Sequence, residues 1–249
     1  MKLHRLVPGW TQTQQMWRFA KFAGEYRKFR SLCLPPRRST LSWSDRYPCL
    51  DDRTCDTGFD RHYIYHTAWA SRAIAEMNPD KHVDIGSSLY FATGLSAFVP
   101  VEFYDYRPAN IELNNLISEH ADLTHLHFDS QSVSSLSCMH VVEHVGLGRY
   151  GDPMNPEADA VAMSELQRVV APGGTLLFVT PVGNPRICFN AHRVYSYEQV
   201  AESFNELTID QFALVPDDPA DGGLLLDPDP SLVKHQQYGC GCFKLRRAK

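Results

Sequence analysis

One stretch decides the fold of this chain: His82-Val83-Asp84-Ile85-Gly86-Ser87-Ser88. It has the pattern of a short apolar strand that ends in an acid and leads into a Gly-Ser-Ser turn. Glycine allows the backbone to come close to a ligand. At the carboxyl edge of an open α/β sheet, such a turn presents backbone N–H groups to a nucleotide or nucleoside. The stretch therefore predicts a nucleoside-binding sheet if the segments after Gly86 supply the other strands.

After Gly86, short apolar runs and turns alternate, which is typical of a parallel sheet with crossovers. Further strands are predicted at 101–106, 136–142, 175–180, 208–215 and 237–245, and helices at 157–170 and 196–204. Thr175–Thr180 is apolar on both faces, as expected of a central strand. Residues 107–121 are too few for a full helix and a full strand, so we predict an abbreviated crossover there.

An N-terminal helical extension precedes the predicted sheet. Apolar and aromatic residues recur at three- and four-residue spacing from Thr11 to Leu34, which predicts one amphipathic helix that Pro35-Pro36 stops. A loop rich in Pro, Asp, Arg and Ser comes next, and then a second helix over Asp60–Met77. We therefore expect two parts, a helical extension with its loop at 1–58 and a Rossmann-like domain at 59–249.

Composition sets the general class of the protein. The chain has 249 residues, of which 43% are hydrophobic and 21% charged, enough for a sizeable α/β core. No apolar run approaches the roughly 18 residues that span a bilayer, and the first residues lack a secretory apolar region, so we expect no membrane span and a cytoplasmic location. Seven cysteines, an odd and unevenly spaced set, suggest reduced thiols. Zinc binding by Cys49, Cys55, Cys240 and Cys242 is disfavoured because neither pair has the usual spacing.

The net charge of −5 conceals an asymmetry, because residues 1–47 carry ten Lys and Arg against two acids. A basic segment of this kind can touch phosphates or an anionic membrane surface. Here the basic residues are spread out, which favours a solvated helix face. We expect no nucleic-acid partner.

Several segments, taken in order, resemble the class I S-adenosylmethionine-dependent methyltransferases. Asp84-Ile85-Gly86 resembles their first glycine motif, and Asp105, 21 residues further on, resembles their ribose-binding acid. Three later segments resemble the adenine-reading segment, the Glu-His segment after the fourth strand and the Pro-Gly-Gly hairpin; they are Asp122–Phe128, His140–Val145 and Glu165–Gly174.

A narrower resemblance is to DUF268, a methyltransferase-like family without an assigned function. It rests on residues 59–70, 137–140, 146–152 and 189–193 and spans about residues 45–245. The resemblance implies a Rossmann-like, doubly wound, mostly parallel α/β sheet of seven strands in the order 3-2-1-4-5-7-6, with the N-terminal helical extension packed near the active edge. It also implies S-adenosylmethionine as cofactor and a small polar methyl acceptor, with a sugar hydroxyl preferred. The oligomeric state is not predicted.

The resemblance further implies which residues bind the cofactor. Asp105 would accept hydrogen bonds from the ribose hydroxyls, and Asp122 one from the adenine amino group. The predicted cofactor-binding set is Asp84, Gly86, Ser87, Ser88, Asp105, Tyr106, Asp122 and Leu123. Structural roles stay open for both acids, since Asp105 could cap the turn at Arg107-Pro108 and the strand before Asp122 is short.

Methyl transfer requires an acceptor held near the methyl group and often a base that takes its proton. The base candidates are His192, His144, Glu143 and His140, and His192 ranks first because it comes after the predicted fifth strand. The substrate-binding candidates are Tyr63, His66, Arg149, Asn190 and Arg193. His62 and Tyr65 share the helical spacing of Tyr63 and His66, which suits either closure over a ligand or a core aromatic stripe.

Two alternatives remain. Ser88 and Tyr90 stand where the later glycines of the Gly-x-Gly-x-Gly turn would be, which fits a degenerate methyltransferase fold that binds a nucleotide, sugar or protein partner without catalysis. Separately, His140-x-x-Glu143-His144 matches an inverted zinc-protease motif, which predicts a zinc hydrolase. That chemistry needs the motif on a helix, whereas here it comes after a predicted strand and leads into a turn. We therefore predict no resident metal.

Overall fold

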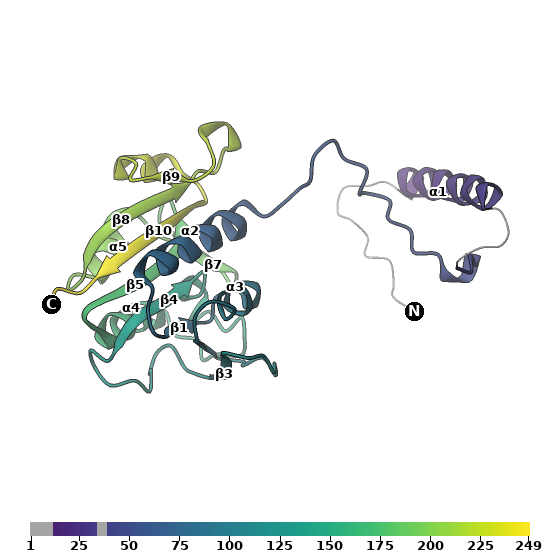
Figure 1. Cartoon of the computed structure of the whole chain (residues 1–249). Helices are drawn as coiled ribbons and strands as arrows, with labels where there is room; N and C mark the ends of the chain where they lie inside the picture. Colours follow the sequence, from purple (N-terminus) through teal and green to yellow (C-terminus); the bar gives the residue numbers. More distant parts are fainter. Residues whose placement is uncertain (1–11, 34–38) are drawn as a thin grey trace. The chain divides into compact units, whose positions relative to one another are not determined.

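The structure is a computed structural model that describes residues 12–33 and 39–249 (Figure 1). The chain divides into two compact units, Met1–Gly58 and Phe59–Lys249. The second unit contains the sheet and the cavities of the candidate site.

The first unit contains one long helix, α1 (Gln12–Leu32), and a short 3₁₀ helix, η1 (Trp43–Asp45). Aromatic side chains of α1 contact the Trp43 ring at centroid distances of 4.9 to 6.3 Å; they are Phe19, Phe22 and Tyr26. The predicted helix therefore forms, while its expected ends at Thr11 and Leu34 and the stop at Pro35-Pro36 lie outside the described residues. Neither α1 nor any other described helix is long and apolar enough to cross a membrane.

An eight-stranded sheet in the order β3-β2-β1-β4-β5-β10-β8-β9 forms the centre of the second unit. Its strands are β1 (His82–Ile85), β2 (Val101–Asp105), β3 (Leu116–His120), β4 (Val133–Met139), β5 (Val170–Val182), β8 (Thr208–Val215), β9 (Leu225–Leu226) and β10 (Gly239–Arg246). The first five pair in parallel, whereas β10 is antiparallel to β5 and β8, and β9 is antiparallel to β8. Without the two-residue β9, the order is the predicted 3-2-1-4-5-7-6.

Helices cover both faces of the sheet (Figure 1). One face carries α2 (Arg61–Met77) and α3 (Leu89–Leu95), and the other carries α4 (Ala158–Val169) and α5 (Tyr197–Ser203). Side chains along β5 alternate between the two cores, because successive residues of a strand point to opposite faces. Leu176 and Phe178 face α4 and α5, while Leu177 and Val179 face α2 and α3. The central strand is thus buried on both sides, as predicted.

Local signals place the ends of these helices. The Asp60 side chain accepts a hydrogen bond from Tyr63 N at 3.1 Å and caps α2, whose C-terminal cap Asn78 has φ +44°. Ser196 caps α5 through a capping box with Gln199, at the start of the helix predicted over 196–204. The crossover before β3 contains no helix, as its length predicted.

Two features near the site differ from the sequence-based expectation. The strand predicted at 136–142 runs instead from Val133 to Met139, because His140 has φ +57° and cannot continue it. The chain then forms a single 3₁₀ turn, η2 (Val142–His144). A hairpin of β6 (Arg186–Cys188) and β7 (His192–Val194) was not predicted at all, since it is short and carries no alternating pattern.

A buried polar network joins β1 to β4. His82 Nδ1 and Nε2 lie 2.8 Å from the hydroxyls of Ser135 and Ser137 respectively, and Ser137 also donates a hydrogen bond to Asp84. A hydroxyl has one proton to donate, so Ser137 accepts from His82 Nε2 and Ser135 donates to Nδ1. Burial lowers the pKa of His82 to about 3 and raises that of Asp84 to about 6. The imidazole therefore stays neutral at pH 7, and the network holds the end of β1.

We expect His82 to make the protein less stable in mild acid. An unfolded imidazole takes up a proton below pH 6.5, whereas folded His82 stays neutral down to about pH 3. The unfolded state therefore binds more protons in this window, and the free energy of unfolding rises with pH. In His82→Gln, the number of protons taken up on unfolding at pH 5 should fall by about one. Urea unfolding between pH 4 and 7 measures this slope, and an unchanged slope in the variant would contradict the assignment.

Candidate functional site

A cavity of about 490 Å³ lies at the carboxyl ends of the parallel strands. Five of the predicted cofactor-binding residues line it; they are Gly86, Asp105, Tyr106, Asp122 and Leu123. His140, His144 and Tyr63 line it as well. The sheet therefore brings residues of several separate segments to one concave site, the usual place for a ligand in an open α/β fold.

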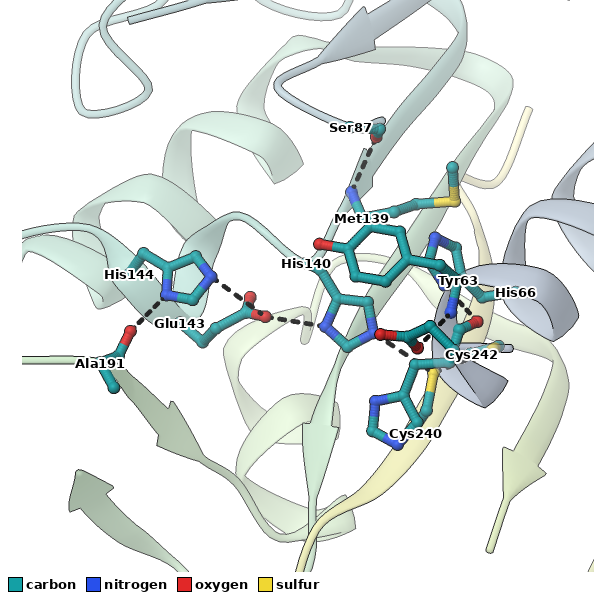
Figure 2. A network of polar contacts seen from close by, with 12 residues as sticks. Tyr63, His66, Ser87, Met139, His140, Glu143, His144, Ala191, Cys240 and Cys242 are labelled. Atoms are coloured by element: carbon teal, nitrogen blue, oxygen red, sulfur yellow. Dashed lines mark hydrogen bonds and ion pairs between the residues drawn. The ribbon is translucent and has the colours of Figure 1, made fainter. Parts of the chain in front are cut away.

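The turn after β1 explains why three predicted cofactor residues do not line this cavity. Asp84 is fully buried and accepts a hydrogen bond from Ser87 N at 3.0 Å, while Ser87 Oγ accepts one from Met139 N at 3.1 Å (Figure 2). Gly86 has φ +68°, and a Cβ there would lie 3.0 Å from Val141 Cγ1. Asp84 and Ser87 thus hold the turn, and glycine is needed at 86 for both the conformation and the close approach.

The replacements for the later glycines do not obstruct the cavity. Ser88 is the N-cap of α3 and makes no side-chain capping bond. Tyr90 is the second residue of α3 and is 93% exposed, outside the cavity lining. The Ser88 and Tyr90 positions therefore leave room for a ligand above Gly86.

The two predicted nucleoside acids each combine a capping role with a place in the cavity wall. Asp105 Oδ1 accepts a hydrogen bond from Arg107 N at 2.7 Å, and Asp122 Oδ1 accepts from Thr124 N and Oγ1 at 2.8 and 2.7 Å. Both acids therefore have the structural role that the sequence left open for them. It uses one carboxylate oxygen of each, and no hydrogen bond from a described residue reaches either Oδ2, so both remain available to a ligand.

A smaller cavity, about 160 Å³, shares three lining residues with the larger one: Tyr63, His140 and His144. The rest of its wall consists of Asp60, His62, Glu143 and Tyr238. The two cavities thus meet at the residues just after β4 and at the start of α2.

A chain of polar contacts runs along this junction (Figure 2). His140 Nδ1 lies 2.8 Å from Glu143 Oε1, and burial lowers the pKa of His140 to about 4 and raises that of Glu143 to about 7. Glu143 is 1% exposed, and its Oε2 atom has no hydrogen-bond partner among the residues described. An unpaired buried carboxylate oxygen is costly, so it marks a place where a ligand donor would be favoured.

His144 has one tautomer fixed by its surroundings. Its Nδ1 donates to the Ala191 carbonyl at 2.6 Å, so the neutral ring keeps its lone pair on Nε2, 3.9 Å from Glu143 Oε1. Burial lowers the pKa of His144, which favours this neutral form. Arg149 Nη1 donates to the same carbonyl at 3.0 Å. The structure thus places an unprotonated imidazole nitrogen where the two cavities meet.

The other candidates occupy different surroundings. His192, ranked first as base, begins β7, packs its ring 4.7 Å from that of Tyr238 and lines neither cavity. Asn190 is exposed and also lines neither. His66 is fully buried outside both linings, with its ring centroid 5.0 Å from that of His140.

Arg193 holds the walls of the site together. It is 4% exposed, and its guanidinium donates to the carbonyls of Val145 and Pro156 at 2.7 and 3.2 Å and lies 3.3 Å from Asp159. These partners occupy the guanidinium inside the fold. The structure therefore gives Arg193 a positioning role, away from an acceptor.

Sequence reasoning missed Asp60 and Tyr238, which complete the wall of the smaller cavity. Asp60 was recognised as the first residue of a predicted helix, but no pattern marked it as part of a site. Tyr238 carried none, because it lies far along the chain and comes to the site only through the antiparallel return of β10.

The inverted zinc-protease arrangement does not form. Its residues lie on a strand end and a 3₁₀ turn, and His140 Nδ1 faces Glu143 while His144 Nδ1 faces the Ala191 carbonyl. Among the described residues, the cluster of possible metal ligands that contains His140 does not include His144, whereas that chemistry requires both imidazoles on one ion.

Comparison with known proteins agrees with this geometry. Residues 99–211 match the family described as Caenorhabditis protein of unknown function, DUF268. No curated protein matches the chain. Among solved structures, the N-methyltransferase NodS from Bradyrhizobium japonicum WM9, in complex with S-adenosyl-L-homocysteine, is similar with a TM-score of 0.54 and 15% identity over 80% of this chain and 91% of that one.

Two further solved structures show the same fold. A candidate methyltransferase from Bacillus halodurans C-125 has a TM-score of 0.52 and 13% identity over 74% of this chain and 99% of its own. A candidate sarcosine dimethylglycine methyltransferase from Galdieria sulphuraria has a TM-score of 0.51 and 12% identity over 74% and 86%. The chain therefore has the fold of the class I S-adenosylmethionine-dependent methyltransferases and matches the DUF268 family over residues 99–211.

Proposed function

We propose that this protein is an S-adenosylmethionine-dependent methyltransferase that acts on a small polar acceptor. The observation that carries the proposal is the pair of adjoining cavities, one walled by Gly86, Asp105 and Asp122 and the other by ionisable and aromatic side chains. The first suits a nucleoside cofactor and the second an acceptor.

The residues present fit the cofactor. A cavity of about 490 Å³ is within the usual range for a ligand of this size. The open space above Gly86 would be reduced by any side chain, since a Cβ there would also lie 3.7 Å from Asp105 Oδ2. Asp105 and Asp122 each offer Oδ2 as an acceptor for ribose hydroxyls and for the adenine amino group. When bound, S-adenosylmethionine supplies an electrophilic methyl group on a sulfonium.

His144 supports the proton transfer that an oxygen or nitrogen acceptor requires. Its Nε2 lone pair stands at the cavity junction, held there by the hydrogen bond from Nδ1 to the Ala191 carbonyl. After taking the proton of the acceptor, the imidazolium would lie 3.9 Å from Glu143 Oε1, where the ionised form of this carboxyl would stabilise it. We therefore assign the base to His144 in place of His192.

The smaller cavity favours a hydroxyl-bearing acceptor such as a sugar. Tyr63 and Tyr238 offer ring faces, while Asp60 and the unpaired Glu143 oxygen offer hydrogen-bond acceptors. Sugars combine apolar ring faces with hydroxyl donors, which matches such a wall. With a volume of about 160 Å³, the cavity accommodates one sugar ring or a group of similar size.

We expect the native protein to bind S-adenosylmethionine and S-adenosylhomocysteine, and Asp105→Ala to bind both about tenfold to a hundredfold more weakly. The reason is the loss of hydrogen bonds to a charged acceptor, worth about 1.5–3 kcal/mol. Isothermal titration calorimetry measures both affinities. Asp129→Ala, which removes an exposed acid outside the cavities, serves as the matched control. If neither ligand binds the native protein at millimolar concentration, the proposal fails.

We expect His144→Gln to lower the methyl-transfer rate by about a hundredfold or more without weakening cofactor binding, since glutamine can still donate to the Ala191 carbonyl but takes no proton. The assay measures transfer from radiolabelled S-adenosylmethionine to a panel of monosaccharides, sugar nucleotides and small amines. The acid limb of the native rate–pH profile should disappear in the variant. Loss of activity in His192→Gln but not in His144→Gln would restore His192 as the base.

A further inference from the structure

Three metal-ligating side chains from three distant segments meet beside the smaller cavity. They are His62 from the first turn of α2, His140 after β4, and Cys240 near the start of β10. One ligand atom of each lies within 4.8 Å of the others. His140 and Cys240 are buried, and His62 is partly buried. The cluster shares only His140 with the inverted zinc-protease motif, and its thiol comes from the C-terminal end of the chain.

The distance between the two buried members already suits a metal site. His140 Nε2 lies 3.5 Å from Cys240 Sγ. Bonds of about 2.0 Å to nitrogen and 2.3 Å to sulfur place the donors of a tetrahedral zinc ion about 3.5 Å apart. To bind the same ion, the His62 ring would have to move about 1 Å closer to the other two ligands. The ring is partly exposed, stacks on the His140 ring at a centroid distance of 5.3 Å and belongs to the first turn of α2.

Groups around the cluster fix His140 as a ligand. Glu143 Oε1 lies 2.8 Å from His140 Nδ1 and accepts its hydrogen, which leaves the lone pair on Nε2, the nitrogen that faces Cys240. A carboxylate on the far nitrogen is the usual partner of a metal-bound histidine, because it fixes the tautomer and makes the ring a better donor. Figure 2 shows this line of contacts from Glu143 through His140 to Cys240.

A second, independent observation concerns His66. The ring is fully buried and its Nδ1 donates to the His62 carbonyl at 2.6 Å, so Nε2 carries a lone pair. That Nε2 has no partner in the described part of the chain. Its ring centroid lies 5.0 Å from that of His140. The cluster therefore has next to it a buried, unprotonated imidazole nitrogen that no internal hydrogen bond uses. Such a nitrogen is expected where a bound cation is part of the structure.

We propose that His62, His140 and Cys240 bind one divalent transition-metal ion, for which zinc is the best match. Two imidazoles and one thiolate are a preferred donor set for zinc, and three protein ligands leave a fourth position for water or a substrate oxygen. His62 and His140 also line the smaller cavity, so that fourth position faces it. Binding converts the Cys240 thiol to a thiolate and releases its proton to solvent. The cluster borders the cavity proposed for the acceptor, but metal binding is tested without cofactor or methyl transfer.

The test uses the full chain stripped of metal with a chelator. Zinc is titrated in competition with a chromophoric chelator, and cobalt is titrated separately as a spectroscopic probe. The native protein should bind one equivalent of zinc with a submicromolar Kd and show a thiolate-to-cobalt charge-transfer band. Cys240→Ala should lose that band and weaken zinc binding at least a hundredfold. His62→Ala should weaken binding about tenfold and keep the band.

Cys138→Ala is the matched control, because Cys138 is an equally buried thiol on β4 that belongs to the opposite core. It should retain the native affinity and spectrum, which shows that removal of a buried thiol does not in itself abolish metal binding. If Cys240→Ala does not fold, His62→Ala at its partly exposed position still decides the matter. Absence of stoichiometric zinc binding by the native chain, or equal losses in Cys138→Ala and Cys240→Ala, would overturn the proposal.

Discussion

The site depends on the close approach of two chain segments, the turn after β1 and the residues just after β4. Gly86 lies against Val141, where an added Cβ would lie 3.0 Å from the valine side chain, and Ser87 Oγ accepts a hydrogen bond from Met139 N and so holds the turn to β4. His140 bonds to the backbone of β5 through its own N–H, 2.9 Å from the Val179 carbonyl. These contacts set the floor of the larger cavity and aim the side chains of residues 140–144 at the smaller one.

His140 and Glu143 are in energetically unfavourable states in this arrangement. A histidine at φ +57° adopts a backbone conformation that residues with a side chain seldom take, and the fully buried Glu143 has one oxygen without a partner among the described residues. Such departures persist where the surrounding structure imposes them, and they are concentrated at functional sites. Here both belong to one pair of hydrogen-bonded side chains that connects the two cavities.

Much of the fold could be predicted from the sequence, because its signals are local. The stretch 82–88 and the apolar runs each indicate an element, and the resemblance supplied the strand order. The β6–β7 hairpin and the two-residue β9 carry too little pattern to be recognised.

The candidate site could be predicted only in part. Strand ends place Asp105 and Asp122 in the cavity wall correctly, since parallel strands share one carboxyl edge. The same reasoning favoured His192, but there the chain folds into a hairpin that packs the ring on Tyr238. Along β7, His192 and its neighbour Arg193 point to opposite sides, so adjacent residues receive unrelated roles. Tyr238 and Cys240 depend on long-range strand pairing, which no local pattern reveals.

The position of β10 in the sheet links folding to ligand binding. β10 lies between β5 and β8, so β8 reaches the rest of the sheet only through a strand that is synthesised after it. The same strand brings Cys240 to the cluster, and Tyr238 lies just before it. Pairings between such distant segments form late in folding, since their loop entropy must first be overcome. A molecule held at the smaller cavity would therefore protect the amide hydrogens of β10 and, through it, those of β8 from exchange with solvent.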